Sequence, residues 1–177
     1  MLGINAVYSP YITKIGFQNQ NNNTQKFSLS EESLEELKRQ QLVLKSEKPD
    51  AEIDMPKIAG ELVNYINGEN PEEAITIGNR IVPLTDDSKL YEQLMEKEKG
   101  KGKNPYIEIQ ALVSVYSFVS GDAENSVNNN FHRNNYNRDT KERIKRIETL
   151  NDVQVSLVQT MNDDIYANRK KRVKKKH

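Results

Sequence analysis

The sequence predicts an all-α, mainly helical protein: four to five helices around a small core, with a long C-terminal amphipathic helix and flexible termini. Three observations indicate this fold class. Apolar residues recur every three or four positions, capping residues, proline or glycine bound the segments in which they recur, and the remaining residues are largely polar. With 35% hydrophobic and 29% charged residues among 177, the core enclosed by these helices is expected to be modest.

Residues 1–27 are predicted to form a flexible N-terminal segment. The Asn- and Gln-rich stretch 18–25 buries too little apolar area to offset the entropy lost on ordering the chain. The stretch before it is more apolar, because it contains Ile4, Val7, Tyr8, Tyr11, Ile12, Ile15 and Phe17. This head either orders on a partner, or forms a strand or short helix that covers the core.

Two helices are expected at the start of a helical domain that spans residues 28–168. A capping-box pattern at residues 28–31 opens the first, which runs to about Lys45. Its stripe consists of Leu34, Leu37, Gln41 and Leu44. Asp54 and Pro56 open the second helix and Gly68 closes it. Its apolar face consists of Ile58, Leu62, Tyr65 and Ile66.

The middle of the chain is predicted to hold one further helix between short irregular segments. Residues 70–73 resemble a cap and a first turn, which residues 75–78 stop, and residues 80–84 read as extended. A cap at residues 85–87 then opens a helix to about Lys99. The glycine- and lysine-containing residues 100–103 are interpreted as a flexible link.

The most apolar segment, residues 106–119, fits two secondary structures. Its apolar residues alternate as in a strand, whereas Pro105 and Gly121 bound it as they would a helix. The end signals favour a helix that is buried nearly all round at the centre of the core. The Asn-rich residues 122–138 are predicted to form a long mobile loop.

Residues 139–168 give the clearest helical pattern. At 100° per residue, one broad arc contains Ile144, Ile147, Leu150, Val155, Leu157, Val158, Met161 and Ile165. A helix of this length, roughly 45 Å, is longer than a small domain needs. We therefore expect part of the arc to bind a partner protein or a second copy of the chain, and burial within the chain is the alternative. The predicted partner-binding residues are Ile144, Ile147, Leu150, Leu157, Met161 and Ile165.

The zero net charge conceals a basic C-terminal tail, residues 169–177. Residues 31–138 hold 13 basic and 20 acidic side chains, so the tail is expected to fold back on this acidic body or to reach an external polyanion. The predicted polyanion-binding residues are Lys170, Lys171, Arg172, Lys174, Lys175 and Lys176. Nucleic acid and an anionic membrane surface are the two candidate polyanions.

Residues with the spacing that catalysis or cofactor binding requires are scarce. The chain has no cysteine, and its two histidines, His132 and His177, cannot build a paired-histidine metal site. Residues 100–103 lack the spacing of a phosphate-binding loop. The pairs Asp86–Asp87 and Asp163–Asp164 point apart on a helix. We accordingly predict no catalytic residue, no cofactor and no metal.

The predicted function is that of a non-catalytic adaptor or assembly protein, which acts through its long C-terminal helix and its N-terminal segment. Polyanion binding by the basic tail is one alternative, and an enzyme with an unrecognised carboxylate site is another. No segment has the length and apolarity of a membrane-spanning helix, and no classical signal peptide is apparent. The expected location is cytoplasmic, or outside the cell by a route that needs no classical signal.

Overall fold

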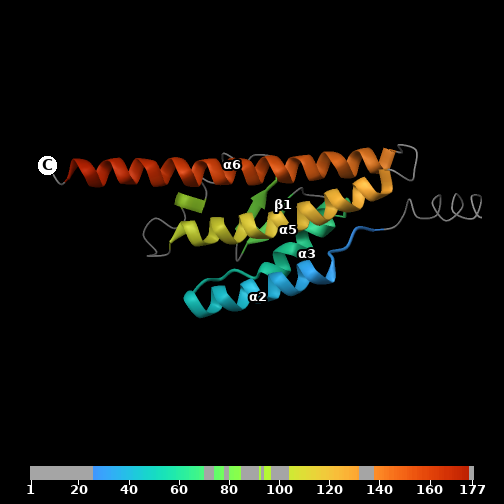
Figure 1. Cartoon of the computed structure of the whole chain (residues 1–177), viewed down its shortest axis with the longest axis horizontal. Coiled ribbons are helices and arrows are strands. Elements are labelled where there is room, and N and C mark those ends of the chain that lie inside the picture. The colour runs from blue at the N-terminus through green and yellow to red at the C-terminus, as the bar shows by residue number, and fades with distance from the viewer. Residues whose placement is uncertain are drawn as a thin grey trace, which may run out of the picture.

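The computed structural model describes residues 26–69, 74–77, 80–84, 92, 94–96, 104–131 and 138–175 (Figure 1). Its elements are α2 (Glu31–Glu47), α3 (Met55–Ile66), β1 (Ala74–Ile77), β2 (Arg80–Pro83), α5 (Pro105–Phe131) and α6 (Arg138–Lys174). The mainly helical fold class is confirmed, including the long C-terminal helix.

The helices pack in a simple order around α5. Helices α5 and α6 form an antiparallel pair along most of the length of α5, and α3 packs against both (Figure 1). Helix α2 lies on α3 and α5 at the side away from α6. The largest fully buried side chains come from all four helices and the hairpin, and include Leu37, Ile58, Leu62, Ile75, Leu112, Tyr116 and Leu150. One core is therefore shared by all of these elements.

Local signals account for α2 and α3, both of which were predicted. Ser30 caps α2 by accepting a hydrogen bond from the Ser33 backbone N–H at 3.2 Å, and Asp54 caps α3 in the same way through Lys57. The buried face of α3 is the predicted one. After α3, Gly68 takes a φ of +74°, in the left-handed region where a glycine ends a helix without steric cost.

A two-stranded antiparallel hairpin follows α3 and packs against it. Strand β1 pairs with β2 so that Ala74 lies opposite Pro83 and Ile77 opposite Arg80. The sequence predicted the extended backbone at residues 80–84 but took residues 75–78 only as the stop of a helical turn. Ile75 is buried, so its side chain adds to the core. The predicted turn at residues 70–73 and the link at residues 100–103 lie outside the described residues.

Within the helix predicted at residues 85–99, residues 92 and 94–96 are described, and they are helical. Leu94 is buried in the common core. This part of the prediction is confirmed, and its ends lie outside the described residues.

Helix α5 confirms the helical interpretation of residues 106–119 but corrects the prediction of its end. The segment that was predicted to be a mobile loop is helical as far as Phe131. Ala123 and Val127 continue the four-residue spacing from Val119, and both are buried against the core. This burial outweighs the weak helix propensity of Gly121 and the asparagines. Residues 132–137, including His132, lie outside the described residues.

The described structure extends past both ends of the predicted helical domain, residues 28–168. Helix α6 does not end at residue 168 but continues through the basic tail to Lys174. Its last turn carries Lys171, Arg172 and Lys174, whose positive charges interact favourably with the carbonyl end of the helix dipole. At the other terminus, Lys26 and Phe27 are described and Phe27 is buried. The flexible segment that was predicted for residues 1–27 therefore does not include these two residues.

Candidate functional site

The predicted partner-binding arc of α6 mostly faces the core of its own chain. Ile147, Leu150 and Leu157 are buried, and Ile144 and Met161 are partly buried against the same cluster. Ile165 is 39% exposed. Sequence reasoning missed Val153, which is buried between Leu150 and Leu157 at helical spacing. Most of this arc is therefore buried within its own chain, which was the alternative to partner binding.

Ile147, Leu150, Val153 and Leu157 form the inner seam of α6, and polar contacts continue it toward the start of α5. The Gln154 side-chain amide donates to the Ser117 hydroxyl at 2.6 Å. Near the start of α5, the Tyr106 hydroxyl donates to an Asp164 carboxylate oxygen at 3.0 Å and accepts from the Asn168 amide at 3.4 Å. Burial, followed by the hydrogen bond to Asp164, raises the pKa of Tyr106. These contacts hold α6 to the body as far as Asn168.

Beyond Asn168 the helix carries the basic residues, and in Figure 1 its red end extends past the start of α5. The exposed cations on this end are Arg169, Lys170, Lys171, Arg172, Lys174 and Lys175. Of the predicted polyanion-binding residues, only Lys176 lies outside the described residues. One alternative was that the tail folds back on the acidic body. Residues 169–174 continue α6 instead, so they do not fold back.

The side of α6 that faces away from the body carries a second regular row of residues, which we call the outer stripe. Successive members are spaced alternately by four and three residues, and every one is exposed. The outer stripe consists of Glu148, Asp152, Val155, Gln159, Asn162, Tyr166, Arg169 and Val173. Val155, Tyr166 and Val173 are 55%, 65% and 62% exposed. Such 4–3 spacing is typical of a helix seam that meets another helix.

A groove opens beside the acidic end of the outer stripe, between the C-terminal part of α5 and the N-terminal part of α6. Its volume is about 280 Å³. It is lined by Glu124, Val127, Asn128, Ile144, Ile147, Glu148 and Asn151. Val127 and Ile147 are buried, whereas Glu124 and Glu148 are exposed. The groove therefore combines apolar and amide groups with exposed carboxylates.

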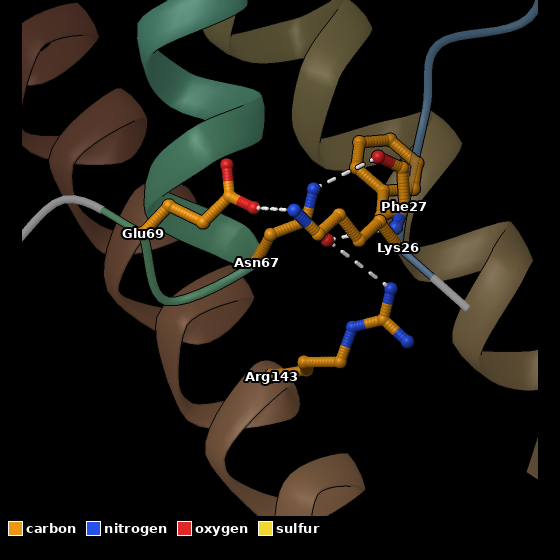
Figure 2. Close-up of polar contacts among 5 residues, drawn as sticks. All are labelled: Lys26, Phe27, Asn67, Glu69 and Arg143. Carbon is orange, nitrogen blue, oxygen red and sulfur yellow. Dashed lines mark hydrogen bonds and ion pairs between the residues drawn. The ribbon is translucent and has the colours of Figure 1, made fainter. Parts of the chain in front are cut away.

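The head joins the body at a hydrogen-bonded anchor (Figure 2). The Asn67 amide contacts both backbone groups of Phe27: its oxygen accepts from the Phe27 N–H at 2.7 Å, and its nitrogen donates to the Phe27 carbonyl at 2.9 Å. Figure 2 also shows Lys26 paired with Glu69 on the turn after α3. This anchor fixes Lys26 and Phe27 on the body; the rest of the predicted N-terminal segment, residues 1–25, lies outside the described residues.

Two arginines of α6 donate hydrogen bonds to Asn67 and to the residue before it. Arg143 donates to the Asn67 amide oxygen at 3.4 Å, and Arg146 donates to the Ile66 carbonyl at 3.4 Å (Figure 2 for Arg143). Burial lowers the pKa of Arg143, the positive charge of Arg146 lowers it further, and Asp139 opposes the change. A Cβ at Gly68 would lie 2.8 Å from the Arg146 guanidinium, so this turn is closely packed. No local pattern predicts this anchor, because Asn67 lies 40 residues from Phe27.

The described residues form no recognisable metal site and no membrane-spanning helix. In that part of the chain, no group of three or more His, Cys, Asp or Glu side chains is arranged to hold a metal ion. None of the described helices is long and apolar enough to cross a membrane. No protein-family model, curated protein or solved structure matches the chain.

Proposed function

We propose that the protein is a non-catalytic assembly protein, whose helical body presents the outer stripe of α6 and the anchored head to protein partners. The outer stripe carries the proposal. Its eight residues follow the spacing of a helix–helix seam along most of α6, yet all are exposed and none belongs to the core cluster of the described residues. The inner seam of the same helix already accounts for its role in folding.

The anchor supports the second part of the proposal. Asn67 uses both ends of its amide on the backbone of one residue, Phe27, and α6 contributes Arg143 to the same cluster. A segment that only trails from a domain needs no such attachment. A segment that binds a partner gains from a fixed point of attachment, because the attached end is then restricted before binding.

Partner capture from the cells that make the protein tests this function. We would compare the full chain with Tyr166→Glu, with a variant lacking residues 1–25, and with Leu42→Glu as a matched control. Leu42 is exposed on α2, far from the outer stripe in sequence, so the control adds the same charge to a different exposed apolar position. A protein that survives nuclease and high salt, and that is lost with Tyr166→Glu or with the head, supports the proposal. Identical recovery with all four chains would contradict it.

The basic end of α6 favours a second candidate function, polyanion binding. Six cations are exposed within the seven residues 169–175, and such a concentration of positive charge favours contact with phosphates. Binding of this kind should weaken steeply with salt, with a slope of about 0.9 in log K against log salt for each phosphate contacted on duplex DNA. Neutralising Lys170, Lys171 and Lys174 with glutamine should lower that slope. A complex that is unchanged by salt and by these substitutions would exclude this function.

A further inference from the structure

The outer stripe complements a reversed copy of itself. Pairing α6 with an antiparallel second α6 about a point between residues 160 and 161 places each stripe residue opposite another stripe residue. Val155 then faces Tyr166, Gln159 faces Asn162, and Asp152 faces Arg169. The remaining pair is Glu148 with Val173. From this juxtaposition we propose that the outer stripe binds a second copy of the chain in an antiparallel, two-fold symmetric helix pair. This inference rests on the proposed function and names the partner of that surface.

Charge selects the antiparallel orientation. In a parallel pair, identical residues would meet, so that Asp152 would face Asp152 and Arg169 would face Arg169. In the antiparallel pair each Asp152 faces an Arg169, and this contact occurs twice because the interface is two-fold symmetric. In this pair the cations of the projecting end would also approach the exposed carboxylate Glu148, which lines the groove. Lys145 lies about one helical turn before Glu148, at the end of the paired region.

The apolar residues follow the same symmetry. Val155 and Tyr166 are more than half exposed in the single chain, and each would cover the other in the pair. On one flank of the seam, Ile165, which is 39% exposed, would meet the partly buried Val158 of the second copy. The amide pair Gln159–Asn162 lies at the centre. Polar residues at such a position fix the register at some cost in affinity.

The geometry of α6 makes this contact intermolecular. The acidic and basic ends of the outer stripe lie on one continuous helix, separated by about 20 residues or roughly 30 Å, so they cannot meet within one chain. The core lies on the opposite side of α6. Two copies can therefore pair through their outer stripes with the two bodies on opposite sides. Because few apolar residues meet, we expect a Kd on the order of micromolar.

Cysteine cross-linking of the full chain tests both the partner and the orientation. The chain has no cysteine, so each variant carries a single thiol. Under mild oxidation, a mixture of Val155→Cys and Tyr166→Cys chains should give a disulfide-linked dimer. Each variant alone should give at least about fivefold less, because two copies of either residue lie about 16 Å apart along the antiparallel pair. Ala167→Cys replaces Tyr166→Cys as a matched control, since Ala167 is exposed but turned by about 100° from the outer stripe.

Charge exchange supplies an independent measurement. Asp152→Arg alone and Arg169→Asp alone should each weaken dimerisation by about tenfold, and the double variant should restore it because the symmetric pairs are remade with reversed sign. Unchanged thermal unfolding of each variant would show that its fold is intact. No rescue in the double variant would overturn the proposed register.

The outcomes separate this inference from the proposed function. If Val155→Cys alone cross-links as strongly as the mixture of Val155→Cys and Tyr166→Cys, the helices pair in parallel and the antiparallel pairing is overturned. If the chain is monomeric but binds a different protein, and Tyr166→Glu abolishes that binding, the second copy is not the partner. The proposed assembly function would then remain. A monomeric chain whose outer stripe and head affect no protein complex would overturn both.

Discussion

The two sides of α6 carry apolar residues in similar patterns, but they differ in what covers them. On the inner side, Leu150, Val153 and Leu157 are buried against the other helices. On the outer side, Val155 and Tyr166 are exposed in a row that also carries two acids toward one end and Arg169 toward the other. The comparison suggests a division of roles: the inner seam stabilises the fold, and the outer stripe is available for association.

The largest expected effect comes from removing a side chain of the inner seam. Leu150 is fully buried, so Leu150→Ala leaves a cavity and should lower the free energy of unfolding by about 2–5 kcal/mol. Val155→Ala, five residues away on the outer stripe, should change it by less than about 0.5 kcal/mol. Chemical denaturation of the two variants at one low protein concentration measures both. Equal losses would break the division between the two sides.

The second largest expected effect comes from the anchor, where Asn67 at the end of α3 binds the backbone of Phe27. Asn67→Ala removes both hydrogen bonds to Phe27, leaves its partly buried backbone groups without these partners, and should cost about 1–3 kcal/mol of stability. It should also make the backbone N–H groups near Phe27 exchange faster with solvent. Hydrogen exchange followed by mass spectrometry checks this, with Asn64→Ala, an exposed position on α3, as the control. Protection at Phe27 that does not change would remove Asn67 from the anchor.

On the outer side, Tyr166→Glu should act on association rather than on folding. The added charge would lie opposite Val155 of a second copy, so we expect the Kd for dimerisation to rise by at least tenfold, or about 1.4 kcal/mol. The thermal unfolding midpoint, measured where the chain is monomeric, should stay within a few degrees of the parent. Light scattering after gel filtration reports the dimer fraction. A large loss of thermal stability would show that Tyr166 contributes to the fold.

The smallest expected effect concerns the last contact between α6 and the body. Tyr106→Phe removes the hydroxyl that bonds Asp164 and Asn168, and should cost about 0.5–1.5 kcal/mol. The folded-state pKa of Tyr106 is raised above its ordinary value of 10, so its contribution is present below that pH and is lost as the pH rises through the folded-state value. The stability difference between Tyr106→Phe and the parent should therefore be constant near neutral pH and shrink in strong alkali. A difference that is constant throughout would exclude this hydrogen bond as its source.

Local signals were sufficient for much of the fold. The capping pattern at residues 28–31, Asp54 and the spacing of apolar residues located α2, α3 and the body of α6, since these features act within a few residues. The cap of α2 is Ser30, however, and not the Ser28 that the capping-box spacing implies. The end of α5 was not predictable in this way. Gly121 and the asparagines favour a loop locally, whereas the burial of Ala123 and Val127 depends on helices that are distant in sequence.

The candidate site shows the same limit. A helical projection found the apolar arc of α6 but included the exposed Val155 and missed the buried Val153, because a broad arc does not locate the line of closest contact. The Asn67 anchor and the contact between Ser30 and Asp122, 92 residues apart, depend on tertiary packing alone. The basic end was recognised from its composition, but its helical continuation was not.

Sedimentation equilibrium of the full chain over about 1–500 µM tests the central claim most directly, since this range spans the micromolar Kd expected for the outer-stripe pair. We expect a reversible monomer–dimer equilibrium for the parent chain and for Leu42→Glu, and a monomer over most of the range for Tyr166→Glu. A parent chain that remains monomeric at every concentration would contradict the account, and so would a dimer that Tyr166→Glu leaves unchanged.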